Sequence, residues 1–277
     1  MAVVLIYRAL GLGDFLTGVP AYRALRRAFG EHRIVLAAPR VLAPLAELTG
    51  AIDEVVDTAP LGPAPAGADV AVNLHGRGPQ SIELLRASNP TRLITFTTGT
   101  WREDEHEVHR WCRLLGEHGI PADPDDLQLR PPDVASPAPG ATVIHPGAAS
   151  VARRWPAERW AAVARTLDDD VVITGAPAER SPLIPGRPLD TDLPTLAATV
   201  AHARRVLCGD TGVAHLATAF GTPSVVLFGP TPPDRWGPPA NRPRHRVLWA
   251  GRTGDPHATT TDPGLLEISV DDVLDAL

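Results

Sequence analysis

Short runs of apolar residues alternate with segments of helical periodicity along almost the whole chain, and this alternation constrains the fold more than any other feature. Residues 2–7 (AVVLIY) are typical of a strand buried on both faces, and the apolar spacing over residues 15–29 predicts a helix after it. Further strands are expected at 33–38, 69–74 and 92–95, and further helices at 41–48, 80–87 and 105–117. This alternation predicts an α/β protein with parallel sheets and right-handed crossovers.

A proline-rich stretch divides the chain into two parts. Six prolines fall between residues 121 and 140, and the alternation restarts after them, with strands at 141–145, 171–174, 205–208 and 224–228 and helices at 157–167, 193–201 and 213–220. At 277 residues, the chain is long enough for two domains of ordinary size. We predict domains over residues 1–135 and 136–277, with a tail, residues 263–277, that is a candidate to pack back on the first domain.

Composition excludes several classes of function. All 26 basic residues are arginine, and the formal charge of −6 leaves neither half with a basic face for nucleic acid. Cys112 and Cys208 lie far apart without the spacing of a zinc site, so buried thiols are expected. No run of 18 apolar residues and no signal peptide occur. We therefore expect a cytoplasmic protein with no nucleic-acid partner and no integral membrane segment.

The first strand is followed by the turn Gly11-Leu12-Gly13-Asp14. It is not a dinucleotide-binding fingerprint, because Leu16 stands at the third glycine position and no carboxylate ends the second strand. The two glycines still permit close backbone approach, and they bring Asp14 to the start of a helix at the carboxyl end of the first strand. Asp14 is therefore either a functional carboxylate or an N-cap.

Two loops in the second half are suited to bind phosphate. Asp210, Thr211 and Gly212 lead from a strand into a helix whose first N–H groups are free to hold an anion, although an ordinary capped helix has the same sequence. His215 follows about one turn into that helix. In the other loop, Arg153 and Arg154 stand immediately before a predicted helix, and they form either a phosphate site or a solvated basic pair.

No convincing metal-binding pattern is present. Asp190 and Asp192 spell DxD, but they precede a helix in a proline-rich stretch, and His106 and His109 miss the HExxH spacing. Neither a GxSxG motif nor a P-loop occurs, which disfavours hydrolase and kinase functions. We expect neither a metal site nor a cofactor.

Six short motifs occur in one order along residues 1 to about 240. They are residues 11–14 (GLGD) with Pro20, 106–110 (HEVHR), 145–147 (HPG) leading to 154–156 (RWP), 175–179 (GAPAE), 209–217 (GDTGVAHLA) and 228–231 (FGPT). In this order and spacing they resemble glycosyltransferase family 9, the ADP-heptose:lipopolysaccharide heptosyltransferase family.

The resemblance implies a GT-B fold, in which two Rossmann-like doubly wound domains face each other across a cleft. The first domain would hold mainly the acceptor and the second the nucleotide sugar. The reaction implied is inverting and metal-independent: an ADP-sugar, by expectation ADP-heptose, gives its sugar to a hydroxyl of a glycan or small molecule.

Position by position, the resemblance implies that Asp14 is the general base. It also implies that Arg153, where the family usually has lysine, binds phosphate, that Glu179 meets the ribose and that the backbone at Thr191 meets the adenine. Further donor-binding residues are expected around the pyrophosphate and sugar: Asp210, Thr211, Gly212, His215 and Ser150. Ser150 substitutes for hydroxyl side chains that the heptosyltransferases commonly carry where this chain has alanines. On the acceptor side we expect Gly13, Arg8, Arg77 and His106.

The chain departs from the family between residues 180 and 191, which are few and proline-rich where many members have a full helix and strand. Two alternatives therefore stay open: a nucleotide-sugar-binding protein without transferase activity, and a GT-B enzyme that uses a UDP-sugar. The presence of Asp14 favours an enzyme.

Overall fold

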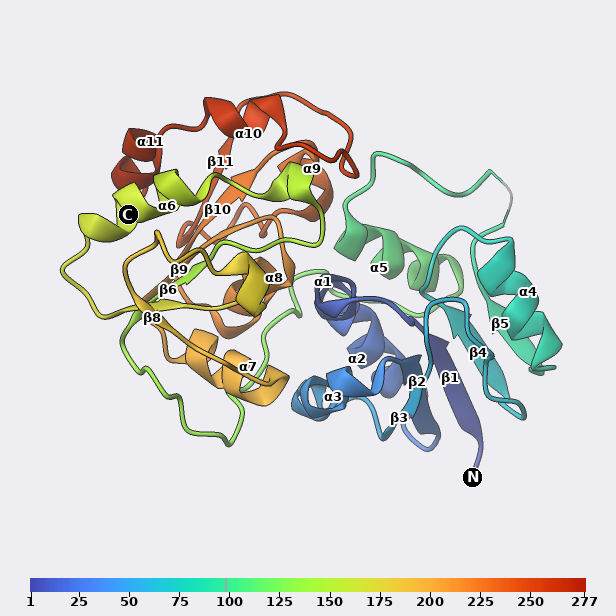
Figure 1. Ribbon diagram of the computed structural model, residues 1–277. Helices are drawn as coiled ribbons and strands as arrows, with labels where there is room; N and C mark the ends of the chain where they lie inside the picture. The colour runs from blue at the N-terminus through green and yellow to red at the C-terminus, as the bar shows by residue number, and fades with distance from the viewer. Residues whose placement is uncertain (98) are drawn as a thin grey trace. The chain divides into compact units, whose positions relative to one another are not determined.

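The chain folds into two compact units, Met1–Arg130 and Pro131–Leu277, in a computed structural model that describes residues 1–97 and 99–277 (Figure 1). The division falls in the proline-rich stretch, close to the boundary expected from the sequence. Each unit contains one sheet in which every pairing is parallel. The predicted α/β class is therefore confirmed for both halves of the chain.

The first unit is built on a sheet with the strand order β3-β2-β1-β4-β5. Its strands are β1 (Val3–Tyr7), β2 (Arg33–Ala38), β3 (Glu54–Asp57), β4 (Val70–Asn73) and β5 (Arg92–Ile94). Its helices are α1 (Leu12–Thr17), α2 (Val19–Ala28), α3 (Ala43–Thr49), α4 (Gln80–Ala87) and α5 (Glu107–Glu117), with a 3-10 turn η1 (Arg40–Leu42). β1 is central and pairs with β2 from Val3 opposite Arg33 and with β4 from Val4 opposite Val70.

The helix predicted over residues 15–29 is two helices, because α1 ends at Thr17 and α2 begins at Val19, with Gly18 between them. Pro20 lies in the first turn of α2, where its missing N–H costs no hydrogen bond. A side chain at position 18 has no room, since its Cβ would lie 2.4 Å from the Tyr22 hydroxyl oxygen. The break leaves α1 as a short helix that carries Asp14 directly after β1.

The second unit has a sheet with the strand order β11-β10-β9-β6-β7-β8. Its strands are β6 (Thr142–His145), β7 (Val171–Ile173), β8 (Arg187–Pro188), β9 (Arg205–Gly209), β10 (Ser224–Phe228) and β11 (His245–Trp249). Its helices are α6 (Ala157–Arg165), α7 (Leu193–Ala201), α8 (Gly212–Phe220), α9 (Pro233–Trp236), α10 (Pro263–Glu267) and α11 (Val270–Asp275), with 3-10 turns η2 (Val151–Arg153) and η3 (Pro177–Glu179).

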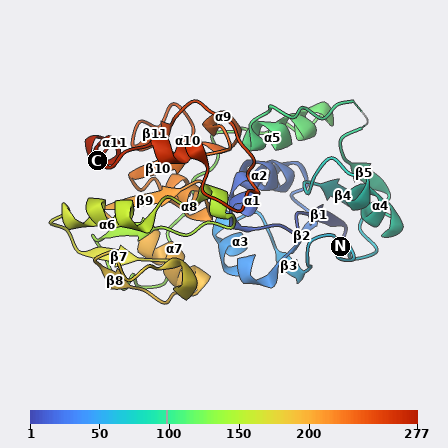
Figure 2. The ribbon, with the colours of Figure 1, turned by 45° about the horizontal axis from the view of Figure 1, so that its top comes forward.

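Helices cover both faces of the second sheet (Figure 2). α6 packs against α11 on one face, and α7 packs against α8 on the other (Figure 1). The core on the α6 side contains the buried rings of Trp155 and Trp160, in edge-to-face contact at 4.8 Å between centroids. The chain tail, for which a return to the first domain is one expectation, is anchored here: Leu265 and Val273 are fully buried in this core.

The topology of each sheet identifies the loops that are most suited to bind a ligand. In the first sheet, β1 lies between β2 and β4. The chain therefore adds β2 and β3 on one side of β1 and then crosses over to add β4 and β5 on the other side. In the second sheet, β6 lies between β7 and β9 in the same way. Ligands of open α/β sheets bind at such switch points, outside the carboxyl ends of the strands. Asp14 follows β1, Arg153 follows β6 and Asp210 follows β9.

Candidate functional site

Asp14 lies in the first turn of α1, at the switch point of the first sheet. The N-cap of this helix is Gly11, which makes no side-chain hydrogen bond, so the alternative that Asp14 is the N-cap is wrong. The Asp14 side chain is 29% exposed, and its Oδ1 lies 3.8 Å from the Arg8 guanidinium. Burial raises the pKa of this carboxyl above its ordinary value, the charge of Arg8 opposes the rise, and Glu107 adds to it. Asp14 is thus a partly buried carboxylate whose pKa depends on Arg8 and Glu107, and it does not cap the helix.

Arg8, predicted on the acceptor side, is buried beneath the Asp14 turn. Its Nε donates to the main-chain oxygen of Asp14 at 2.5 Å, and its Nη2 donates to Thr17 Oγ1 at 3.1 Å and to Glu107 Oε1 at 3.0 Å. Only 1% of the residue is exposed. Its guanidinium therefore supports the turn that carries Asp14 and is not presented for contact with an acceptor.

The other predicted acceptor-side residues lie in separate places of the first unit. Gly13 is part of α1 next to Asp14. His106 is the N-cap of α5, where its Nδ1 accepts from the main-chain N–H of Val108 at 3.2 Å. Arg77 forms an ion pair with Glu103 at 2.8 Å, and about two thirds of each side chain is exposed. The structure thus joins Gly13 and Arg8 to Asp14, whereas Arg77 pairs with Glu103 and His106 caps α5.

Arg153 and Asp210 meet at the switch point of the second sheet. Arg153 Nη1 lies 3.2 Å from the main-chain oxygen of Asp210 and 3.5 Å from its Oδ2. Burial raises the pKa of the Asp210 carboxyl, and the neighbouring guanidinium opposes this rise. Arg153 Nε is buried and has no hydrogen-bond partner among the residues that the structure describes. The guanidinium is about a quarter exposed, so it has donor capacity that is free to bind an anion.

The turn after β9 brings a helix N-terminus to the same place. Thr211 is the N-cap of α8 and accepts from the N–H of Val213 at 3.3 Å, and Gly212 is the first helical residue. The backbone at Gly209 lies close to this loop, because a Cβ there would lie 3.0 Å from the main-chain oxygen of Arg153. His215 lies one turn further on, with its ring 6.1 Å from that of Trp236. The loop after β6 and the start of α8 are therefore packed together, as the sequence-based hypothesis requires.

Ser150 takes part in this loop through a local role. Its Oγ accepts from the N–H of Ala152 at 3.3 Å and caps the short turn η2 that ends at Arg153. The segment between β11 and α10 approaches the same loop, since the N–H of Asp262 donates to the oxygen of Ala152 at 3.1 Å. Ser150 thus helps to shape the loop that presents Arg153.

Glu179 lies in the turn η3 after β7, in contact with the loop that follows β6. Its Oε1 lies 3.3 Å from Arg154 Nη2, and a Cβ at Gly147 would clash with its carboxylate. His145, at the end of β6, donates or accepts through Nδ1 with Thr174 Oγ1 at 3.0 Å, and burial lowers the pKa of its ring to about 4. A polar residue at the end of a buried strand, such as His145, indicates in the sequence a place next to the ligand-binding edge of the sheet.

The three residues at 190–192 do not form a carboxylate pair. Asp190 forms an ion pair with Arg180, and Asp192 is the N-cap of α7, where its Oδ1 accepts from Thr195 N–H at 2.9 Å. Thr191 lies between them, after the edge strand β8 that pairs with β7. The described residues include no group of three or more His, Cys, Asp or Glu side chains arranged to hold a metal ion. Glu179 follows β7 and Thr191 follows β8. Because these strands are paired in parallel, both residues come after strand ends at the same edge of the sheet.

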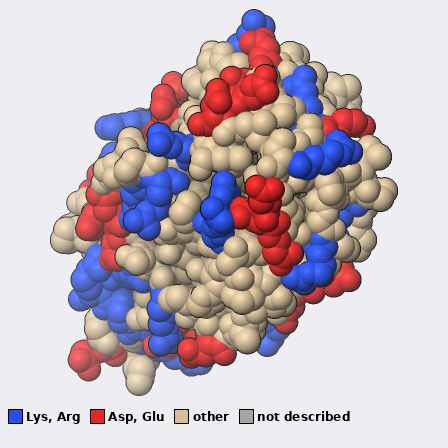
Figure 3. Space-filling view, turned by 90° about the vertical axis from the view of Figure 1, so that its left-hand side faces the viewer, with Lys and Arg blue, Asp and Glu red and all other residues tan. Residues whose placement is uncertain are grey.

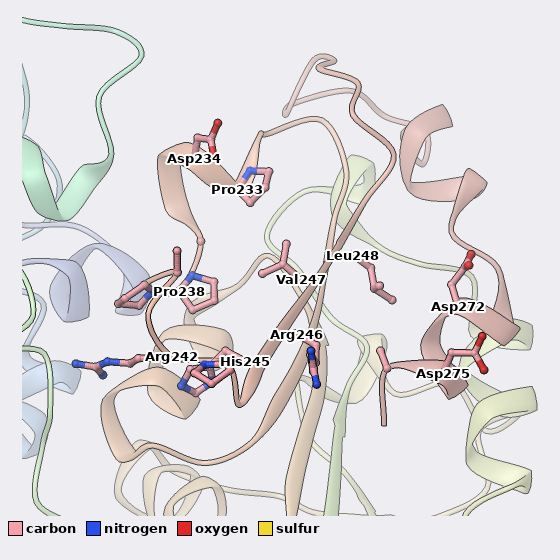
Figure 4. Close-up of a pocket in the computed structure, with 15 residues that line it drawn as sticks. Pro233, Asp234, Pro238, Arg242, His245, Arg246, Val247, Leu248, Asp272 and Asp275 are labelled. Carbon is pink, nitrogen blue, oxygen red and sulfur yellow. The ribbon is translucent and has the colours of Figure 1, made fainter.

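A large cavity in the second unit lies away from these residues. It has a volume of about 810 Å³ and runs along the edge strand β11, between the α9 segment and α11. His245 and Arg242 are at one end of it and Asp272 and Asp275 at the other (Figure 4). None of the predicted donor-binding residues lines it. The cavity flanks the edge strand of the sheet and not the carboxyl ends of the strands. We therefore assign the candidate site of the second unit to the switch point of its sheet and not to this cavity.

Comparison with known proteins shows which family this chain matches. The family model for glycosyltransferase family 9 (heptosyltransferase) matches residues 98–263, which are more than half of the chain. Lipopolysaccharide heptosyltransferase 1 of Pseudomonas aeruginosa is 32% identical over 150 residues, which cover 48% of this chain and 42% of that protein. The chain therefore matches less than half the length of this curated relative.

Solved structures match over nearly the whole chain. A glycosyl transferase of family 9 from Veillonella parvula has a TM-score of 0.77 at 20% identity, covering 99% of this chain and 96% of that one. The ADP-heptose lipopolysaccharide heptosyltransferase II of Escherichia coli has a TM-score of 0.74 at 20% identity, covering 100% and 97%. These matches confirm the predicted GT-B fold. By its motifs, its two parallel-sheet units and the match of the family model, the chain belongs to glycosyltransferase family 9, the heptosyltransferase family.

Proposed function

We propose that this protein is an inverting glycosyltransferase that moves a sugar, by our proposal a heptose, from an ADP-sugar to a hydroxyl group of a glycan or small-molecule acceptor. The observation that carries the proposal is the arrangement at the second switch point. There, the Arg153 guanidinium lies against Asp210, directly before the N-terminus of α8. A guanidinium and free helix N–H groups in one place are suited to bind a diphosphate.

In the proposed reaction, the first unit supplies the general base and the second unit binds the leaving diphosphate. The acceptor oxygen attacks the anomeric carbon of the donor, and the bond from that carbon to the diphosphate breaks with its electron pair on the leaving oxygen. Asp14 takes the proton of the acceptor hydroxyl, as a general base. Arg153 and the N–H groups at the start of α8 stabilise the negative charge that develops on the diphosphate. A single displacement of this kind inverts the configuration of the anomeric carbon.

Nothing in the described residues suggests an alternative partner of another class. Arginine and acidic side chains are interspersed on the face of the molecule shown in Figure 3, as expected for a surface that does not bind a polyanion. Among the described helices, none has the length and apolar character that a membrane crossing requires. The proposal therefore concerns a small nucleotide sugar and a hydroxyl-bearing acceptor.

The donor class is tested by thermal shift with nucleotide diphosphates and nucleotide sugars. We expect ADP and ADP-sugars to raise the melting temperature more than UDP or GDP at equal concentration, because Glu179 and Thr191 align with the ribose and adenine contacts of the family. A ligand at 100 times its dissociation constant stabilises the folded state by about 2.7 kcal/mol, which is readily measured. A larger shift with a UDP-sugar would reject the ADP-sugar assignment in favour of the UDP-sugar alternative.

Removal of divalent cations is expected to leave turnover unchanged. Asp190 and Asp192 are engaged with Arg180 and with the start of α7, whereas Arg153 and the α8 N-terminus supply positive charge for the leaving diphosphate. Turnover is measured in the presence of EDTA and again after addition of Mn²⁺ or Mg²⁺. Activity that is lost with EDTA and restored by a metal ion would contradict this mechanism.

A further inference from the structure

A buried charge cluster connects α5 to the turn that carries Asp14. It consists of Arg8, Glu107 and Arg110, of which 1%, 6% and 6% of the surface is exposed. Burial of a charge is unfavourable unless the charge is paired and hydrogen-bonded. The three charges are paired through Glu107, and none of the three side chains has a direct role in the proposed reaction.

Arg8 acts on the Asp14 turn in two ways. Its Nε bonds the main-chain oxygen of Asp14 at 2.5 Å, and the same oxygen accepts from Thr17 Oγ1 at 2.9 Å. Its Nη2 lies 3.8 Å from Asp14 Oδ1, and its Nη1 donates to the main-chain oxygen of Leu74 after β4. A single guanidinium thus ties the ends of the two central strands to the helix that presents the carboxylate.

Glu107 fixes this guanidinium from the far side. Its Oε1 accepts from Arg8 Nη2 at 3.0 Å and from Trp111 Nε1 at 2.8 Å, and its Oε2 accepts from Arg110 Nη1. Arg110 is itself held over the ring of Trp101, with its Cζ 4.2 Å from the ring centroid. Both oxygens of Glu107 are therefore held by donors, and the orientation of its carboxylate is determined by α5.

We propose that Glu107 is a positioning residue that acts through Arg8 on Asp14: it holds the buried guanidinium against the Asp14 turn and offsets its positive charge, so that Asp14 remains basic enough to take the acceptor proton. This inference rests on the proposed function, because it requires that Asp14 is the general base. Without Glu107, the uncompensated charge of Arg8 would stabilise the ionised form of Asp14 and weaken it as a base.

The charged and titratable groups that face Asp14 in the first unit come from three elements. They are Arg8 after β1, Tyr22 on α2 and Glu107 on α5. Burial raises the pKa of Tyr22, so its phenol stays neutral. Burial works against ionisation of Glu107, but the charges of Arg8 and Arg110 outweigh it and lower the pKa of its carboxyl. Glu107 is therefore ionised near neutral pH, and its replacement by glutamine removes one negative charge from the cluster.

The test is the pH dependence of turnover in Glu107→Gln. Glutamine keeps a carbonyl oxygen for the Trp111 and Arg8 donors, and we expect the acidic limb of the kcat profile to move to lower pH while the plateau falls about tenfold. Glu105→Gln is the matched control: Glu105 is 12% exposed and pairs with Arg113, with no contact to Arg8. This control is expected to leave both the limb and the plateau as in the wild type.

Asp14→Asn separates this inference from the proposed function. If that variant keeps wild-type turnover, Asp14 is not the base, and the proposed mechanism and the role of Glu107 both fail. If it loses turnover while Glu107→Gln has a wild-type profile, the mechanism stands and the role of Glu107 alone is refuted. Should Glu107→Gln fail to fold, Arg8→Lys decides: it keeps the charge but loses the fork of bonds to Asp14, Leu74 and Thr17. We expect the plateau of kcat to fall at least tenfold at an unchanged acidic limb, and a wild-type plateau would overturn the proposal.

Discussion

Asparagine at position 14 is expected to lower turnover by roughly 10²- to 10⁴-fold, the usual contribution of a general base, while donor affinity hardly changes. The amide has nearly the shape of the carboxylate, but it cannot accept the proton of the acceptor hydroxyl. Because Gly11 and not Asp14 is the N-cap of α1, the substitution removes no cap. The measurement is kcat with a working acceptor, together with the dissociation constant for ADP.

The melting temperature of Asp14→Asn should stay near that of the wild type. Burial raises the pKa of Asp14 in the folded protein, so the stability linked to this group is fully present below its unfolded pKa and is lost as the pH rises through its folded pKa. At neutral pH, the ionised carboxyl therefore does not favour the folded state, and a neutral amide is tolerated. Normal turnover in a folded variant would show that Asp14 is structural and that the base lies elsewhere.

Alanine at position 153 is expected to weaken donor binding by about 1.5–3 kcal/mol, the cost of losing a charge-assisted hydrogen bond to phosphate, which is roughly a 10- to 150-fold rise in Kd. Arg153→Lys should keep most of the affinity, because an ammonium group also binds phosphate and lysine is usual at this position in the family. The Kd for ADP, measured by calorimetry, tests both variants.

Two further variants make the comparison specific. Arg154 is held by the oxygen of Ala148 and by Glu179, so Arg154→Ala should affect donor binding less than Arg153→Ala and through the orientation of Glu179. Arg187→Ala, which removes a half-exposed arginine paired with Asp170, should have no effect. Equal losses from Arg153→Ala and Arg154→Ala would contradict the assignment of the phosphate contact to Arg153, and no loss from either would reassign this pair to a solvated surface.

Much of the fold follows from local pattern, and its exceptions have physical reasons. Buried parallel strands are continuous apolar runs, and residues 2–7 or 224–228 are recognisable for that reason. The apolar pattern does not reveal β3, because Glu54 and Asp57 make it a half-polar edge strand. It does not reveal β11 either, because that strand follows a proline-rich segment without periodicity. The break between α1 and α2 depends on the packing of Gly18 against Tyr22, a contact that periodicity does not reveal.

The candidate site shows the same division between local and tertiary information. The sequence indicates Asp14, Arg153 and Thr211 because they follow strands in loops that favour anions or helix starts, and the structure places them at the two switch points. The link from Glu107 to Arg8 joins residues 99 positions apart, and the pairing of Arg154 with Glu179 joins residues 25 apart. Such contacts are created by the packing of separate elements, so a single sequence gives no sign of them.

The release of ADP from ADP-heptose shows whether this protein transfers sugar from an ADP-sugar. The assay follows ADP by a coupled enzyme reaction with the wild type and with Asp14→Asn, over a panel of glycan and small-molecule acceptors. We predict ADP release that depends on one class of hydroxyl acceptor and that falls by at least 10²-fold in Asp14→Asn. Tight binding of ADP without acceptor-dependent release across the panel would instead indicate a nucleotide-sugar-binding protein without transferase activity.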